Sequence, residues 1–175
     1  NNNISAFVEK PEEFVSDLAI IGIYYFNDGE YLQEELQYLI DNNIKEKGEY
    51  QLTNALENMQ RKGKTFSPGR VQEWLDCGNK SATIHTNQRV LVNKGSYISK
   101  KAILENSKII EPCYISDSAK IKNSVVGPYV SVGSNIEIEN CKIKNTILQG
   151  DSTILNAELY NSMIARNVYY RSNNT

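Results

Sequence analysis

The stretch "IKNSVVGPYVSVGSNIEIENCKIKNTIL", Ile121–Leu148, decides the fold of the C-terminal half. Its aliphatic residues recur every five or six positions, a period that fits neither a 3.6-residue helix nor one long alternating strand. From residue 115 onward, the residue two places before each aliphatic is usually small, with Val130 and Ile136 as the larger exceptions. The same period extends in both directions, through Ile103, Ile109, Ile115, Ile121, Val126, Val132, Ile138, Ile143, Leu148, Ile154, Leu159 and Ile164.

Spacing within this series predicts a three-sided coil. Every third aliphatic is separated by 16 or 17 residues, which defines three sets. Each set should stack into one parallel sheet, so the pattern predicts a solenoid of roughly four turns with one aliphatic side chain per side pointing inward. The sets are Ile109, Val126, Ile143 and Leu159; Ile115, Val132, Leu148 and Ile164; and Ile121, Ile138 and Ile154.

Asparagines repeat with the same spacing. Asn106, Asn123, Asn140 and Asn156 each precede the small residue, and Asn145 with Asn161 begins a second series. Asparagine tolerates the left-handed backbone region better than most non-glycine residues. We therefore expect stacks of asparagine at corners where the chain turns sharply in every coil.

Composition excludes several classes of protein. The 175 residues carry 19 basic and 21 acidic side chains, a net charge of −2, without a basic cluster typical of nucleic-acid binding. No apolar stretch reaches the ~18 residues of a membrane span. Three cysteines and one histidine, His85, favour neither a disulfide scaffold nor a zinc site. We expect a soluble, reduced, cytoplasmic protein, and we interpret the strand-like start at residues 5–8 as a cut.

The first ninety residues have an α/β pattern. Strands are expected at Ser5–Glu9, Ala19–Phe26 and Val71–Leu75, and helices at Tyr31–Ile40, Tyr50–Arg61 and Lys80–Val90. The glycines are scattered, so a Gly-rich phosphate loop is not visible. The only tryptophan, Trp74, is expected in the core.

Four short motifs follow one another in this half: "FVEKP" (Phe7–Pro11), "AIIGIYYF" (Ala19–Phe26), "KGEYQLTNAL" (Lys47–Leu56) and "EWLDCGN" (Glu73–Asn79). Their order resembles the second half of the catalytic domain of sugar-phosphate nucleotidylyltransferases, especially glucose-1-phosphate thymidylyltransferases. The C-terminal repeat resembles the hexapeptide repeat of left-handed β-helices, which follows the catalytic domain in several members. The resemblance implies a partial, Rossmann-like α/β nucleotidyltransferase domain at residues 1–91 and a left-handed parallel β-helix at residues 92–175. It also places the family's Gly-rich loop and first metal-binding Asp upstream of Asn1.

The resemblance assigns roles to single residues. Lys10 corresponds to the catalytic ammonium that neutralises the sugar phosphate, and Glu9 to the carboxylate that binds sugar hydroxyls. Gly22 and Glu49 correspond to positions near the sugar, and Asp76 to a Mg²⁺ ligand. From the residues alone, Glu9 and Lys10 could be a surface pair, Glu49 a charge at a helix start and Asp76 a helix cap.

Two departures weaken the choice of substrate: Asn54 stands where the thymidylyltransferases commonly have Asp, and Cys77 stands where Thr is frequent. We assign Asn54 no metal role. The base of the nucleotide stays open, because the part that selects it in the family lies upstream.

The expected function is synthesis of a nucleoside diphosphate sugar and pyrophosphate from a nucleoside triphosphate and a sugar 1-phosphate, with glucose 1-phosphate the expected sugar. The chain alone is expected to be inactive and to form homo-oligomers through its β-helix. The alternatives are a noncatalytic oligomerisation or regulatory module and, less well supported, a β-helix acyltransferase. An acyltransferase needs a general base, and the repeat holds no histidine. Cys113 and Cys141 occupy small inward positions and are expected to be packed thiols rather than nucleophiles.

Overall fold

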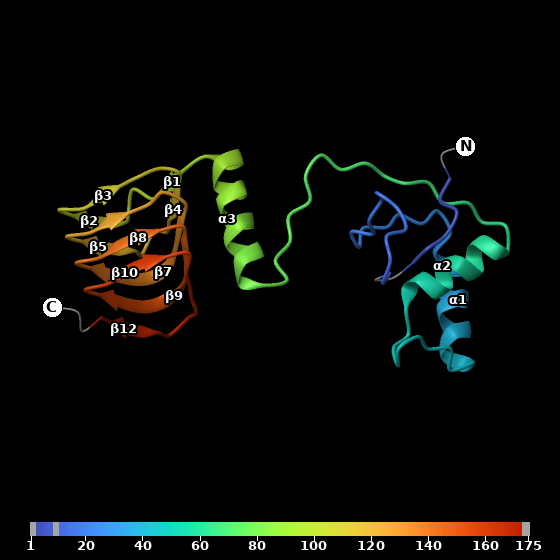
Figure 1. Ribbon diagram of the computed structural model, residues 1–175. Helices are drawn as coiled ribbons and strands as arrows, with labels where there is room; N and C mark the ends of the chain where they lie inside the picture. The colour runs from blue at the N-terminus through green and yellow to red at the C-terminus, as the bar shows by residue number, and fades with distance from the viewer. Residues whose placement is uncertain (1–2, 9–10, 173–175) are drawn as a thin grey trace. The chain divides into compact units, whose positions relative to one another are not determined.

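A computed structural model describes residues 3–8 and 11–172 (Figure 1). The chain divides into two compact units, one ending at Trp74 and the other beginning at Leu75, and each is described by itself. Among the described residues, none of the helices has the length and apolar character needed to cross a bilayer.

The first unit is built around two helices, α1 (Gly29–Asp41) and α2 (Leu52–Arg61). The carboxylate of Asp28 caps α1 by accepting a hydrogen bond from the Tyr31 N–H at 3.0 Å. Glu35 is buried on α1 and forms an ion pair with Lys62, which follows α2, so a charged contact joins the two helices. Both helices were predicted, and their positions are confirmed.

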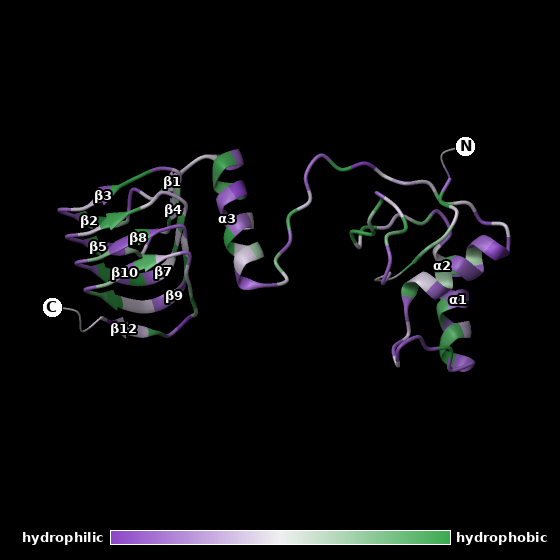
Figure 2. Cartoon of the chain, in the orientation of Figure 1, coloured by the Kyte–Doolittle hydropathy of each residue, from purple (hydrophilic) through white to green (hydrophobic). Residues whose placement is uncertain are grey.

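The expected strands of the first unit are not formed. Among the described residues, Ala19–Phe26, Val71–Leu75 and the described part of Ser5–Glu9 form no strand. A strand exists only where a neighbour completes its hydrogen bonds, so β propensity without a partner leaves an extended segment. Trp74 is 56% exposed, which corrects the expectation that it lies in the core. Figure 2 colours hydrophobic residues green, and green stretches occur in the segment before α1.

The second unit consists of helix α3 (Lys80–Lys94) followed by a parallel solenoid with three faces. The first face contains β1 (Tyr97–Ile98), β4 (Cys113–Ile115), the starts of β7 (Val130–Glu139) and β9 (Thr146–Leu155), and β11 (Met163–Ile164). The second contains β2 (Ile103–Glu105), β5 (Lys120–Lys122), the ends of β7 and β9, and β12 (Tyr169–Arg171). The third contains β3 (Lys108–Ile109), β6 (Val125–Val126), β8 (Lys142–Lys144) and β10 (Glu158–Tyr160).

The predicted register of the solenoid is confirmed on all three faces. Val126 pairs with Ile109 and Ile143, Val132 pairs with Ile115 and Leu148, and Ile138 pairs with Ile121 and Ile154. The solenoid has about five turns rather than the roughly four expected, because β1 and β2 precede the three predicted stacks and β12 follows them.

The first turn also contains one wrong assignment. Ile103 was predicted to point inward, but it is the partner of the exposed Lys120, whereas Leu104 is the partner of the buried Ile121. The inward position on β2 therefore belongs to Leu104. The aliphatic period alone cannot distinguish two adjacent aliphatic residues, because only the pairing with the next coil sets the face.

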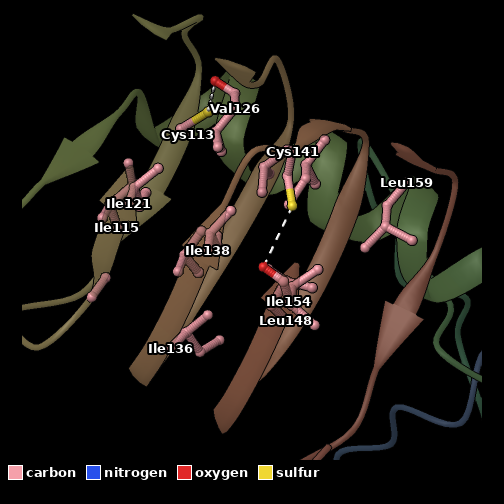
Figure 3. Close-up of a cluster of buried hydrophobic side chains, with 14 of the residues drawn as sticks. Cys113, Ile115, Ile121, Val126, Ile136, Ile138, Cys141, Leu148, Ile154 and Leu159 are labelled. Atoms are coloured by element: carbon pink, nitrogen blue, oxygen red, sulfur yellow. Dashed lines mark hydrogen bonds between the residues drawn. The ribbon is translucent and has the colours of Figure 1, made fainter. Parts of the chain in front are cut away.

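The core of the solenoid alternates branched and small side chains, as Figure 3 shows around Cys113 and Cys141. The polar members of the small positions satisfy their hydroxyl groups on nearby backbone: Ser124 donates to the Lys122 carbonyl at 2.7 Å and Thr146 to the Lys144 carbonyl at 2.8 Å. The core therefore accepts hydroxyls without leaving polar groups unpaired at these two positions. The buried small residues are Cys113, Ala119, Ser124, Cys141, Thr146, Ser152 and Ala157.

Asparagines occupy the corners, as predicted. All six residues of the two expected series have positive φ, between 46° and 54°. Their side chains bond from coil to coil, with Asn106 donating to Asn123 at 2.8 Å and Asn145 to Asn161 at 2.8 Å. A third corner was not predicted: Asn135 (φ 54°) donates to Asp151 (φ 49°) at 2.9 Å. Asp151 replaces asparagine there and also accepts a bond from Arg166.

Helix α3 packs on the first face of the solenoid, beside which it runs in Figure 1. Ile84 and Leu91 are its buried residues. Between them, Asn87 accepts a hydrogen bond from the Ser131 hydroxyl of β7 at 2.6 Å. The helix was predicted as Lys80–Val90 and extends to Lys94, where Gly95 (φ 80°) ends it.

Candidate functional site

The two residues at the centre of the predicted site, Glu9 and Lys10, lie outside the described residues. The segment before them is anchored in the first unit. Phe7 is buried and packs edge-on against Phe66, with ring centroids 5.0 Å apart. Ile4 donates its N–H to the Phe66 carbonyl at 2.8 Å. These contacts fix the chain just before the EKP motif.

Gly22 lies in the second motif with φ 75°, a left-handed backbone conformation that is strained for residues with a side chain. A methyl group added at its α-carbon would meet no atom of the protein within 4 Å. Within the chain, glycine is therefore required here by backbone conformation rather than by crowding.

Glu49 follows a tight turn. Lys47 (φ 51°) and Gly48 (φ 85°) occupy the two central positions, both with positive φ, as in a type I′ turn. Backbone bonds of 2.9 and 3.0 Å between Glu46 and Glu49 close the turn. The side chain of Glu49 is exposed, and α2 begins only at Leu52, so Glu49 precedes the helix.

Asp76 is held in a turn at the start of the second unit. Its Oδ1 accepts the Gly78 N–H at 2.9 Å, and its carbonyl accepts the Thr86 hydroxyl at 2.6 Å. A Cβ at Gly78 would come within 3.2 Å of Oδ1 and 3.3 Å of Oδ2, so glycine leaves room for the carboxylate. Asn79, which accepts the Ala82 N–H, caps α3. Capping of α3 therefore does not account for Asp76.

The ordered turn around Asp76 involves residues that sequence reasoning missed. Thr86 and Asn87 carried no signal, because they lie in a helix with polar residues on most sides. Their roles depend on distant partners, at Asp76 and Ser131.

Gly22 and Glu49 belong to the first unit and Asp76 to the second.

The described residues do not gather three or more His, Cys, Asp or Glu side chains into a metal cluster. Mg²⁺ in nucleotide-dependent enzymes is commonly held by one or two carboxylates, with substrate phosphates and water completing the octahedron. A single half-buried carboxylate such as Asp76, with one oxygen already oriented by a backbone N–H, fits that donor set.

The solenoid itself offers poor nucleophiles. Cys113 and Cys141 are buried, as predicted, and burial raises the pKa of both thiols. A groove at the corner between the first and second faces is lined by charged side chains that neutralise each other: Lys101 with Asp117 at 3.3 Å, and Lys120 with Glu137 at 2.8 Å. Neither feature resembles a reactive centre.

Comparison with known proteins agrees with the architecture. The family model described as "Nucleotidyl transferase" matches residues 1–93, which include all four motifs. A glucose-1-phosphate thymidylyltransferase of Streptomyces antibioticus is 26% identical over 91% of this chain and 49% of its own length. A bifunctional sugar-1-phosphate nucleotidylyltransferase/acetyltransferase of Sulfurisphaera tokodaii is 31% identical over 87% of this chain and 45% of its own.

A low-salt glycan biosynthesis nucleotidyltransferase of Haloferax volcanii is 28% identical over 87% of this chain and 46% of its own length. The chain thus spans about half the length of the curated relatives it matches. The match of the family model to more than half of the chain supports the resemblance carried by the motifs. This protein belongs to the nucleotidyl transferase family.

Proposed function

We propose that this chain is the sugar-binding side and the solenoid of an enzyme that makes a nucleoside diphosphate sugar from a nucleoside triphosphate and a sugar 1-phosphate. The observation that carries the proposal is the family match over residues 1–93, which contains the four motifs in order and leads into a parallel solenoid. Glucose 1-phosphate is the proposed sugar, because relatives of two Streptomyces species are named glucose-1-phosphate thymidylyltransferases.

In the proposed reaction, a phosphate oxygen of the sugar 1-phosphate attacks the α-phosphorus of the triphosphate. A new P–O bond forms, the bond to the β-phosphate oxygen breaks, and pyrophosphate leaves with the electron pair. Two anions must approach each other, so the protein contributes alignment and positive charge rather than a covalent nucleophile.

Lys10 supplies that charge in our proposal by pairing with the phosphate of the sugar 1-phosphate. Glu9 accepts hydrogen bonds from sugar hydroxyls. The anchored segment before them supports these roles, because Phe7 and Ile4 hold the chain immediately upstream. Alignment of this kind contributes most when the supporting residues are themselves fixed.

Gly22 and Glu49 complete the sugar-binding side in the proposal. The left-handed backbone at Gly22 and the absence of a side chain there leave space for a ligand against the main chain. Glu49 is exposed at the end of a tight turn, where its carboxylate is free to meet sugar hydroxyls.

Asp76 is the proposed Mg²⁺ ligand of this chain. Bound Mg²⁺ would neutralise charge on the phosphates. The contribution of Asp76 is a carboxylate whose orientation is set before substrate arrives, by the Gly78 N–H on Oδ1.

The enzyme needs a nucleotide-binding half in addition to this chain, and the chain alone is inactive in our proposal. Supporting this, apolar side chains in the segment before α1 are exposed, including Phe14 (83% exposed) and Tyr25 (89% exposed). Extended segments with such side chains suit a sheet whose other strands bury them.

The solenoid serves for oligomerisation in the proposal, and the three free thiols suit the reducing cytoplasm. A noncatalytic module is the alternative. It predicts that the site residues can be changed without effect on catalysis.

The test is a substitution at Asp76 in the longer protein that joins this chain to its nucleotide-binding half. Asp76→Asn should lower kcat/KM for pyrophosphate formation by about two to four orders of magnitude, with partial recovery at raised Mg²⁺. Asp117→Asn, at an exposed carboxylate of the solenoid, is the control and should leave kcat/KM unchanged. Wild-type kinetics for Asp76→Asn would remove Asp76 from the proposed site.

A further inference from the structure

The backbone carbonyl of Asp76 accepts a hydrogen bond from the side chain of Thr86, a residue of α3. Threonine inside a helix usually turns its hydroxyl to the carbonyl four residues earlier, which for Thr86 is Ala82. Here the Thr86 hydroxyl instead donates to the Asp76 carbonyl, ten residues away, at 2.6 Å. One turn earlier in the helix, the Thr83 hydroxyl lies 2.9 Å from the Asn79 carbonyl, four residues before it, and 3.2 Å from the Cys77 carbonyl.

The helix that makes these bonds is itself fixed on the solenoid. Asn87, the neighbour of Thr86, accepts the Ser131 hydroxyl of β7 at 2.6 Å and donates to the Tyr129 carbonyl at 3.4 Å. Ile84 and Leu91 are buried on the same helix. Ser131 lies on β7, which is hydrogen-bonded on both edges, to β4 and to β9. A continuous set of contacts therefore runs from the rigid strands to the backbone of Asp76.

We propose that the solenoid, through α3, holds the turn around Asp76 in place, and that Thr86 is the positioning residue that fixes the backbone of Asp76. The proposal rests on the proposed function, in which Asp76 binds Mg²⁺. Ligands must be held within about 0.5 Å of the productive geometry, and groups behind a metal ligand commonly supply that precision. Asp76 lies outside any strand or helix, so the turn depends on α3 for its position.

The first experiment measures the turn without metal or substrate. Amide hydrogen exchange at Gly78 in this chain reports the bond from its N–H to Asp76 Oδ1. Thr86→Val keeps a β-branched side chain but removes the hydroxyl, and exchange at Gly78 should become about fivefold faster, the factor expected for one hydrogen bond of ordinary strength. Thr86→Ser restores the hydroxyl and should restore slow exchange. Unchanged exchange in Thr86→Val would overturn the proposal.

The second experiment measures Mg²⁺ dependence in the longer protein. Thr86→Val should raise the Mg²⁺ concentration needed for half-maximal pyrophosphate formation by about 10- to 100-fold, and Thr86→Ser should restore it. Asp76→Asn is assayed beside them. If Asp76→Asn is impaired and Thr86→Val matches wild type, positioning of Asp76 by Thr86 is overturned while the proposed function stands. If Asp76→Asn matches wild type, Asp76 is not the Mg²⁺ ligand, and its positioning by Thr86 is then overturned together with that part of the proposed function.

A third variant tests the solenoid end of the contacts. Ser131→Ala removes the donor to Asn87, and Ser134→Ala removes an exposed hydroxyl from the same strand. Ser131→Ala should accelerate exchange at Gly78 and raise the Mg²⁺ requirement in the same direction as Thr86→Val, whereas Ser134→Ala should do neither. Equal behaviour of the two serine variants would show that the solenoid does not position Asp76.

Discussion

Among single residues, Val126 is a direct test of the packing inside the solenoid. It is fully buried and lies between Ile109 and Ile143 on the third face. Val126→Asp would place a charge there without a partner, so we expect the free energy of unfolding to fall by about 3–5 kcal/mol. Thermal and denaturant unfolding of the variant measure this loss.

Lys122 and Lys144 are the matched controls, since each follows an inward aliphatic and is exposed. Lys122→Glu and Lys144→Glu should change the free energy of unfolding by no more than about 0.5 kcal/mol. Large losses in these two variants, together with a harmless Val126→Asp, would contradict the assigned faces.

Asn140 tests the corner geometry. Its φ is 54°, and it donates to Asn156 at 3.1 Å. Asn140→Ala should lower the free energy of unfolding by about 1–2 kcal/mol, because alanine is strained in the left-handed region. Asn140→Gly keeps that conformation and should lose less. Thermal melts of the pair decide: a glycine variant less stable than the alanine variant would contradict a conformational role.

Spacing made the inward aliphatics and two asparagine corners predictable, since each solenoid position repeats every 16 or 17 residues. The third corner follows the same spacing through Asn135, Asp151 and Asn167, all with positive φ. It was missed because aspartate interrupts the asparagine series and Ser118 precedes it. Ile103 was assigned inward because period alone cannot choose between it and Leu104.

At the scale of elements, the helices of the first unit were easier to predict than its strands. The apolar stripes of α1 and α2 meet within the unit, so local pattern and packing agree. The segment Ala19–Phe26 has strong β propensity but no paired neighbour among the described residues. The role of α3 in holding Asp76 depends on hydrogen bonds made by Thr86 and Ser131, which cannot be predicted from a periodic sequence pattern.

The strands of the solenoid also protect two thiols. Burial raises the pKa of Cys113 and Cys141, so at a given pH less of each thiol is the reactive thiolate, and reaction should require pH nearer the raised pKa. Cys77 is exposed. Iodoacetamide at mildly alkaline pH should therefore modify Cys77 first, as read by mass spectrometry, and the other two only after unfolding. Rapid modification of all three in the folded chain would contradict the inward placement.

At the scale of the whole molecule, the two units contribute differently to the proposed enzyme. The first carries the sugar-side motifs, and the second joins Asp76 to a rigid solenoid. The chain spans about half the length of its relatives, and in the proposed function a nucleotide-binding part completes the enzyme. Family membership was predictable from four ordered motifs, whereas the roles of Glu9 and Lys10, which lie outside the described residues, stay predictions.

The most direct test is release of pyrophosphate from dTTP or UTP in the presence of glucose 1-phosphate. The longer protein should release pyrophosphate, this chain alone should not exceed a heat-denatured control, and Lys10→Ala in the longer protein should lower kcat/KM by about two to four orders of magnitude. Release by this chain alone, or wild-type kinetics for Lys10→Ala, would contradict the account.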